Sequence, residues 1–330
     1  MLERVGADEL PTDAVPRLER RVARLLGKPA AVLFPTGTMA QQVALRIHAD
    51  RSGRRVVAFH PCCHLEVHEQ KGYSAVHGLT GQLVGDRHRL IGLCDLRAVV
   101  QPLAALVLEL PQRDIGGQLP TWDDLVAQTQ WARDHDAMLH LDGARLWEAQ
   151  PFYDRPHAEI AALFDSVYVS LYKGLLGNSG AVLAGSEEFV DHARIWRWRL
   201  GGNMTTAWPV ALLAERGLDQ ALPRMAEFAT RAREVAAALG TIPGVQIVPD
   251  PPQTPLFHVH LAAEPHAITQ AAHELLEQRR VQLFLYTRTT PSPRSCSFEI
   301  TVGAQFDDFT TDEVRDLIAD LLDRALANSD

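Results

Sequence analysis

Short apolar runs alternate with helix-like segments through the first two thirds of the chain. Apolar residues recur every three or four positions over 16–26, which predicts a helix that ends at Gly27 and Pro29. The apolar runs that predict buried strands lie at 30–34, 56–59, 104–108, 138–141, 166–171 and 181–184. Helical patterns at 39–47 and 122–133 lie between such runs. The alternation predicts an α/β fold with a mostly parallel sheet covered on both faces.

The pattern changes past about residue 205. A long helical pattern runs to residue 239, and further segments predict a helix at 267–279 and strands at 257–261, 281–285 and 297–301. The last helix opens with a capping box, Thr310 and Glu313. We therefore expect a large domain over 1–215, with a short N-terminal arm, and a smaller α+β domain over 216–330.

Composition narrows the class of protein. The chain has 330 residues, 46% of them hydrophobic and 22% charged, so it can form a large core. A net charge of −9 argues against a nucleic-acid partner. Because no apolar run approaches membrane-spanning length and the acidic N-terminus has no apolar segment, we expect neither a membrane anchor nor a secretory signal. Four cysteines make no disulfide framework, so the expected location is cytoplasmic.

Three segments at predicted strand ends could carry chemistry, because ligands of doubly wound sheets bind at the carboxyl ends of strands. Gly37 and Thr38 lie in a turn before a helix, and a helix N-terminus can bind a phosphate group. An ordinary turn between a strand and a helix would have the same sequence pattern. Asp142 ends an apolar strand, where it could equally cap the next helix. Lys173 directly follows another strand and is one of only three lysines among 32 basic residues.

Together these segments fit pyridoxal 5′-phosphate (PLP). The turn at Gly37 would anchor the phosphate, Lys173 would form the Schiff base, and Asp142 would keep the pyridine nitrogen protonated. A lysine can lose its proton and attack a carbonyl, which an arginine cannot do. Burial and neighbouring cations would lower the pKa of such a lysine.

The chain resembles the threonine aldolase group of the beta-eliminating lyases, which are PLP enzymes of fold type I. The matching stretches are LERRVARLLGKPAAVLFPTGTMAQQVAL, LHLDGARLWEA, DSVYVSLYKGLLGNSGAVLAG and RWRLGGNM, in the family's order. The resemblance implies cleavage of a β-hydroxy-α-amino acid between Cα and Cβ, giving glycine and an aldehyde. It also implies a homodimer or homotetramer whose site lies at the subunit interface.

Site residues follow from the same resemblance. It implies that Gly37, Thr38 and Ser170 bind the cofactor with Asp142 and Lys173. Arg145 would contact the cofactor and the substrate carboxylate. His64 would stack on the pyridine ring and could serve as a base.

The resemblance is incomplete around the substrate. Gln112 stands where the family has a histidine that handles the β-hydroxyl group, and a glutamine cannot act as a base at neutral pH. No arginine matches the family's C-terminal one, so Arg113, Arg288 or Arg294 would bind the carboxylate. Other PLP reactions therefore stay open: β-elimination, racemisation or a biosynthetic condensation. A non-catalytic scaffold is the remaining alternative, which would need neither Lys173 nor Asp142.

Two further clusters have competing interpretations. His60, Cys62, Cys63, His64 and His68 crowd into one segment and could ligate zinc, but their spacing fits no standard zinc pattern, so we expect no metal. The segment 194–199 mixes arginine with tryptophan, as single-strand binders do. In an acidic protein one such run favours a helix face at an interface.

Overall fold

A computed structural model describes residues 13–175 and 177–327, and these fall into two compact units. The first unit comprises the chain up to Asp114 and from Leu119 to Pro223. The second comprises Ile115–Gln118 and the chain from Arg224 onward. The expected domain boundary at 215 stays a prediction, and the expected N-terminal arm lies outside the described residues.

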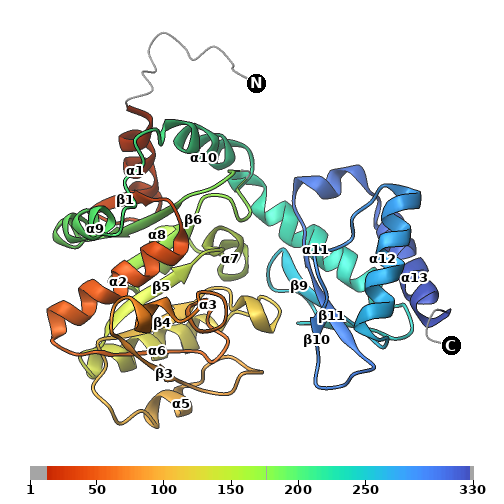
Figure 1. Cartoon of the computed structure of the whole chain (residues 1–330), viewed down its shortest axis with the longest axis horizontal. Coiled ribbons are helices and arrows are strands. Elements are labelled where there is room, and N and C mark those ends of the chain that lie inside the picture. Colours follow the sequence, from red (N-terminus) through yellow and green to blue (C-terminus); the bar gives the residue numbers. More distant parts are fainter. Residues whose placement is uncertain (1–12, 176, 328–330) are drawn as a thin grey trace. The chain divides into compact units, whose positions relative to one another are not determined.

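The first unit is built on a seven-stranded sheet (Figure 1). Its strands are β1 (Ala30–Phe34), β2 (Val56–Phe59), β3 (Thr80–Leu83), β4 (Ala105–Glu109), β5 (Met138–Gly143), β6 (Ser166–Ser170) and β7 (Ala181–Gly185). They lie in the order β1-β7-β6-β5-β4-β2-β3. All neighbours from β6 to β3 are parallel, whereas β7 runs antiparallel to both β1 and β6. The predicted mostly parallel α/β sheet is confirmed.

Helices pack against this sheet. They are α1 (Ala14–Leu25), α2 (Gly37–Ser52), α3 (His64–Val67), α4 (Gly72–Ala75), α5 (Leu93–Arg97), α6 (Trp122–Asp134), α7 (Leu146–Tyr153), α8 (His157–Ala162), α9 (Glu187–Arg199) and α10 (Trp208–Gln220). Helices α2 and α9 cover β1 and β7, where Val32, Phe34 and Leu183 form a buried apolar cluster with residues of both helices. Helix α1 packs on β1 and α6 on β5. Burial of these apolar faces holds the strand ends in place.

The second unit has an antiparallel sheet in the order β10-β11-β9-β8. Its elements are β8 (Val245–Val248), β9 (Leu256–Leu261), β10 (Arg288–Thr289), β11 (Cys296–Thr301), α11 (Met225–Leu239), α12 (Pro265–Arg279) and α13 (Thr311–Ala327). The long helical pattern to residue 239 is split into α10 and α11 around Pro223, which has no backbone N–H to continue a helix. The capping box is confirmed, since Thr310 Oγ1 accepts from the Glu313 N–H at 3.2 Å.

The strand predicted at 281–285 is wrong. No strand covers these residues, and β10 begins only at Arg288. Leu283 and Phe284, which are consecutive, both pack against the core of the second unit, whereas Leu285 is 84% exposed. A strand sends consecutive side chains to opposite faces, so this arrangement is incompatible with one.

The segment Ile115–Gln118 belongs to the second unit although the chain around it belongs to the first. Gly116 and Gly117 have φ of +92° and +71°, which glycine adopts without strain. A Cβ on Gly116 would lie 2.3 Å from the Val248 carbonyl oxygen, and one on Gly117 would lie 2.7 Å from Leu256 Cδ2. Both glycines therefore pass directly against the β8 and β9 region.

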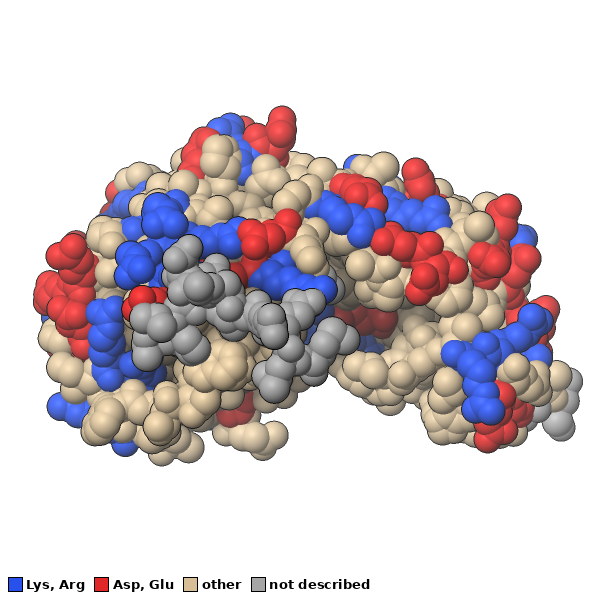
Figure 2. All heavy atoms as spheres, turned by 90° about the horizontal axis from the view of Figure 1, so that it is seen from above, with Lys and Arg blue, Asp and Glu red and all other residues tan. Residues whose placement is uncertain are grey.

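Charged side chains of both signs lie beside one another on the face shown in Figure 2. Between α1 and α10, Arg17 pairs with Glu215 and Arg21 with Asp219, each at 2.6 Å. In the part of the chain that the structure describes, no helix combines the length and the apolar composition needed to cross a bilayer.

Candidate active site

The carboxyl ends of β4, β5 and β6 meet at one edge of the large sheet. Glu109 on β4 is the register partner of Asp142 on β5, and Lys173 follows the end of β6. A cavity of about 180 Å³ lies at this edge. Its lining residues are Thr36, Gly37, Thr38, Gln41, His64, Glu69, Glu109, Pro111, Arg113, Asp142, Ala144, Arg145, Tyr168, Tyr172 and Lys173.

The N-terminus of α2 forms one wall of the cavity. The Thr36 side chain caps this helix by accepting a hydrogen bond from the Met39 N–H at 3.2 Å. The first N–H groups of a helix have no partner within the helix, so those of Gly37 and Thr38 are available to an anion. Gly37 is fixed as glycine by Tyr168, because an added Cβ would lie 2.0 Å from the Tyr168 hydroxyl oxygen. This wall suits a phosphate group.

Asp142 lines the cavity and is 1% exposed. Its Oδ1 accepts from the Ala144 N–H at 3.1 Å, whereas its Oδ2 has no hydrogen-bond partner among the described residues. Burial raises the pKa of this carboxyl group, while His64 and Lys173 act in the opposite direction. A buried carboxylate oxygen without a partner is a costly feature unless a donor binds there, and a protonated pyridine nitrogen is such a donor. The residues present therefore fit PLP.

Lys173 is the amine of this cavity. Burial lowers the pKa of its ammonium group; Asp142 opposes that shift and Arg145 adds to it. Ser170 lies behind the lysine, and its Oγ accepts from the backbone N–H groups of Tyr172 and Lys173, each at 3.3 Å. The loop that presents the lysine is therefore fixed to the end of β6, and the amine is easier to deprotonate than a solvated one.

Glu109 is a second carboxyl group at the same edge, and the sequence patterns did not identify it as a site residue. It accepts from the Arg113 N–H at 3.1 Å and from the Gln112 side-chain amide at 2.9 Å. Burial raises its pKa well above the usual range, and the neighbouring Asp142 carboxyl group adds to this. With Cys63 and Asp142 it forms a group whose potential ligand atoms lie within 4.8 Å of one another. Its strand-end position is the same signal that identified Asp142.

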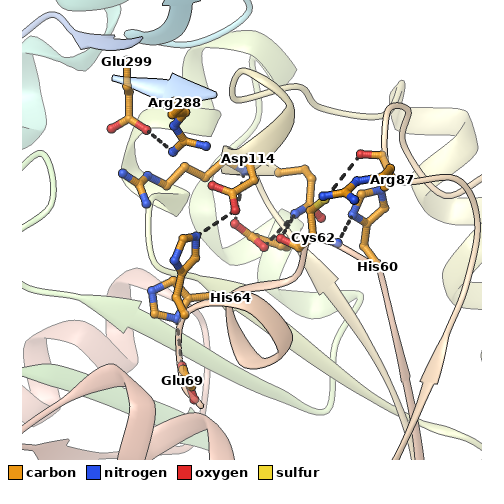
Figure 3. A network of polar contacts seen from close by, with 12 residues as sticks. His60, Cys62, His64, Glu69, Arg87, Asp114, Arg288 and Glu299 are labelled. Carbon is orange, nitrogen blue, oxygen red and sulfur yellow. Dashed lines mark hydrogen bonds and ion pairs between the residues drawn. The ribbon is translucent and has the colours of Figure 1, made fainter. Parts of the chain in front are cut away.

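His64 is held by buried polar groups (Figure 3). Its Nδ1 lies 2.9 Å from Oε1 of Glu69. Glu69 is itself buried and accepts from the side-chain amides of Gln41 and Gln42, at 3.3 and 3.1 Å. The imidazole is thus fixed through one nitrogen, which leaves the other directed elsewhere. No sequence pattern singled out Glu69.

A second histidine–carboxylate pair lies beside the first. His68 Nε2 lies 2.7 Å from Asp114 Oδ2, and the His68 ring centroid lies 5.1 Å from that of His64 (Figure 3). His60 instead binds the carbonyl oxygens of Asp86 and Arg89. The three histidines of this segment therefore each bind a different partner: His60 binds backbone carbonyl groups, His64 binds Glu69, and His68 binds Asp114.

The remaining predicted site residues divide into two groups. Arg145 and Arg113 line the cavity, and Arg145 forms a buried ion pair with Glu148 at 2.9 Å. Gln112 is not among the described lining residues; it is buried, and its amide donates to Glu109 and, at 3.2 Å, to the Cys62 carbonyl. Arg294 is exposed in the second unit.

Arg288, the third arginine considered for the carboxylate, lies on β10 within the second unit. Its guanidinium lies 3.5 Å from a carboxylate oxygen of Glu299 on β11 (Figure 3). The carboxylate-binding role of these arginines stays a prediction.

Comparison with known proteins agrees with this geometry. The family model described as beta-eliminating lyase matches residues 4–264. The chain belongs to this family. A low-specificity L-threonine aldolase 1 from Arabidopsis thaliana is 30% identical over 243 residues, which cover 70% of this chain and 67% of that protein.

Two solved structures extend the comparison. A Listeria monocytogenes protein, described as a candidate L-allo-threonine aldolase, is 39% identical to the present chain and superposes on it with a TM-score of 0.89. The match covers 94% of the present chain and 86% of the Listeria chain. A solved structure described as SPT with PLP has a TM-score of 0.71 to this chain, and the match covers 96% of this chain and 78% of the SPT chain. The two sequences are only 17% identical, so this similarity shows the shared fold alone. The predicted relationship to threonine aldolases of fold type I is confirmed.

Proposed function

We propose that this protein is a PLP-dependent lyase that cleaves a β-hydroxy-α-amino acid between Cα and Cβ, giving glycine and an aldehyde. One observation carries the proposal: Lys173 and the unpartnered oxygen of Asp142 border the same cavity as the N-terminus of α2. A phosphate, a protonated ring nitrogen and an aldehyde carbon would each meet a matching group there. The threonine aldolases among its relatives support the choice of reaction.

The residues would divide the work as follows. Gly37 and Thr38 would bind the phosphate, and Asp142 would hold a proton on the ring nitrogen. Lys173 would provide the amine that attaches the cofactor, supported by Ser170 from behind. When bound, PLP supplies an electron sink for the electron pair released at Cα.

Other lining residues would position the substrate. Arg145 and Arg113 carry the positive charge that a substrate carboxylate requires, and the geometry of a guanidinium suits it. His64, fixed by Glu69, would lie over the cofactor and orient it. Holding the Cα–Cβ bond in one orientation contributes much of such catalysis, because the entropy of orienting the substrate is already lost on binding.

The scarcity of lysine makes a sharp test of this proposal. The protein loaded with PLP is treated with borohydride, which reduces a lysine–cofactor linkage to a stable bond, and is then digested and mapped. We expect the label on Lys173 and not on Lys28 or Lys71, the only other lysines. Lys173→Ala should lose both the visible absorbance and aldehyde release, whereas the control Lys71→Ala, whose side chain is 62% exposed, should keep both. A label on another lysine would refute the site.

Product analysis separates the possible reactions. Threonine, allo-threonine and phenylserine are supplied in turn, and aldehyde, glycine, ammonia and racemised amino acid are measured. Aldehyde with an equal amount of glycine supports the proposal. Because Gln112 replaces the histidine expected for the β-hydroxyl group, β-elimination is the second candidate, and ammonia with a keto acid would favour it.

We further propose that the protein acts in the cytoplasm as a homodimer or homotetramer. The cysteines Cys62, Cys63, Cys94 and Cys296 are free thiols, as a reducing compartment favours. Trp198 on α9 is 73% exposed beside the half-exposed Ile195, an apolar surface that a second subunit would cover. Size-exclusion chromatography with light scattering measures the oligomeric state, and a monomer with full activity would contradict the proposed homodimer or homotetramer.

A further inference from the structure

The cleavage proposed above needs a base, and the residue expected to supply it is not available. Breaking the Cα–Cβ bond to an aldehyde requires that the β-hydroxyl group lose its proton. Gln112 has an amide, which accepts no proton at neutral pH. Its Nε2 also donates to the Glu109 carboxylate and to the Cys62 carbonyl, within a buried environment. Another group must therefore take the proton.

Two histidines near the cavity are each held by a carboxylate through one ring nitrogen, and the role proposed above for His64 is to lie over the cofactor, which leaves His68 for the β-hydroxyl proton. His64 lines the cavity and is fixed through Nδ1 by the buried Glu69. His68, the next histidine, is held through Nε2 by Asp114 and keeps 35% of its side chain exposed. A carboxylate bonded to one imidazole nitrogen selects the tautomer whose other nitrogen has a free lone pair. In His68 that nitrogen is Nδ1.

The His68–Asp114 pair lies next to residues that border the cavity. The His68 ring centroid is 5.1 Å from that of the lining residue His64. Asp114 directly follows Arg113, which is also a lining residue. Figure 3 labels Asp114, whose carboxylate has a dashed contact to an imidazole, and His64 in the same close view. His68 is not itself among the described lining residues, but it contacts the lining residue His64, so a side-chain movement or a bridging water would connect it to a substrate in the cavity.

We propose that His68, oriented by Asp114, is the catalytic base that takes the β-hydroxyl proton. The proton moves from the hydroxyl oxygen to His68 Nδ1, and the O–H electron pair becomes the second bond of the aldehyde carbonyl. The Cα–Cβ electron pair stays with Cα, which is then protonated to give glycine. No oxidant or reductant is needed. The inference rests on the proposed function, and Asp114 acts as a positioning residue.

The test uses His68→Gln in the full chain loaded with PLP, with His88→Gln as the matched control at an exposed histidine of the same unit. A general base contributes about 10²–10⁴-fold, so kcat for aldehyde release should fall by about 10²-fold or more, with little change in KM. PLP affinity, and exchange of the glycine Cα proton with solvent, should stay unchanged because neither involves the β-hydroxyl group. His88→Gln should match the unaltered protein throughout.

A second measurement needs no turnover. Imidazole ¹⁵N NMR of the protein without PLP should show that the neutral His68 ring carries its proton on Nε2 rather than on Nδ1. Asp114→Asn should disturb this tautomer and lower kcat while PLP affinity holds.

The outcomes distinguish this inference from the proposed function. Aldehyde release by His68→Gln within about threefold of the unaltered protein, far below the effect of a lost base, overturns the inference alone. A neutral His68 ring in the unaltered protein that carries its proton on Nδ1 does the same. If the unaltered protein releases no aldehyde from any β-hydroxy amino acid, the proposed function fails and this inference with it.

Discussion

Replacing Gly37 by alanine tests how tightly the phosphate wall of the cavity is built. An alanine Cβ would lie 2.0 Å from the Tyr168 hydroxyl oxygen, 2.4 Å from Cζ and 3.0 Å from Cε2. Real Cβ atoms do not approach other atoms so closely, so either the tyrosine ring or the start of α2 must move. Tyr168 is 3% exposed and packs in the cluster between the sheet and α2, so it has little room to move.

The size of the effect follows from two opposing contributions. Overpacking a dense core destabilises a protein by about 1–3 kcal/mol. Alanine favours a helix over glycine by at most about 1 kcal/mol, and less at a first helical position. Gly37 has no positive φ, so no backbone strain enters. We therefore expect Gly37→Ala to lower the free energy of unfolding by about 1–2 kcal/mol and to weaken PLP binding, since Tyr168 also lines the cavity.

Urea unfolding of the protein without PLP, followed by circular dichroism, measures the first effect, and titration with PLP measures the second. Gly92→Ala is the matched control, because a Cβ there comes no closer than 3.4 Å to any atom. If Gly37→Ala unfolds at the same urea concentration as the unaltered protein and binds PLP equally well, Tyr168 does not pack as described and the reasoning is refuted.

Two further predictions concern stability. Burial lowers the pKa of His140 from 6.5 to about 3, so the folded protein keeps this ring neutral while the unfolded chain takes up a proton below pH 6.5. The neutral His140 ring makes its full contribution to the free energy of unfolding above pH 6.5, and this contribution falls by roughly 1 kcal/mol per pH unit between pH 6.5 and about 3. His140→Gln should flatten that slope in urea unfolding across pH; an unchanged slope would contradict it. Thr310→Ala removes the side-chain cap of α13 and should lower the free energy of unfolding by about 1 kcal/mol. An unchanged urea midpoint would contradict this.

The sequence was most informative where a functional residue directly follows a buried strand. Asp142 and Lys173 each end an apolar run, and parallel strands bring such ends to one edge, so their meeting could be predicted. The Thr310–Glu313 cap depends on residues three apart and is equally local. Local patterns of this kind need no knowledge of tertiary packing.

The misses are contacts or segments that local patterns do not encode. His68 and Asp114 are 46 positions apart, and nothing along the chain links them. Glu69 is buried at the site, where Gln41 and Gln42 on α2, 28 and 27 positions away along the chain, bind its carboxylate. Strand β3, with the sequence TGQL, has a single large apolar residue, so its pairing with β2 comes from tertiary context.

Because Ile115–Gln118 belongs to the second unit, the two units cannot be separated by a single cut in the chain. A fragment beginning at Arg224 would lack the stretch whose Gly116 backbone passes against Val248, and would expose surface that the intact chain keeps covered. The smaller unit is thus assembled from two separate stretches of polypeptide. Swapping it between homologues requires grafting Ile115–Gln118 together with the C-terminal part.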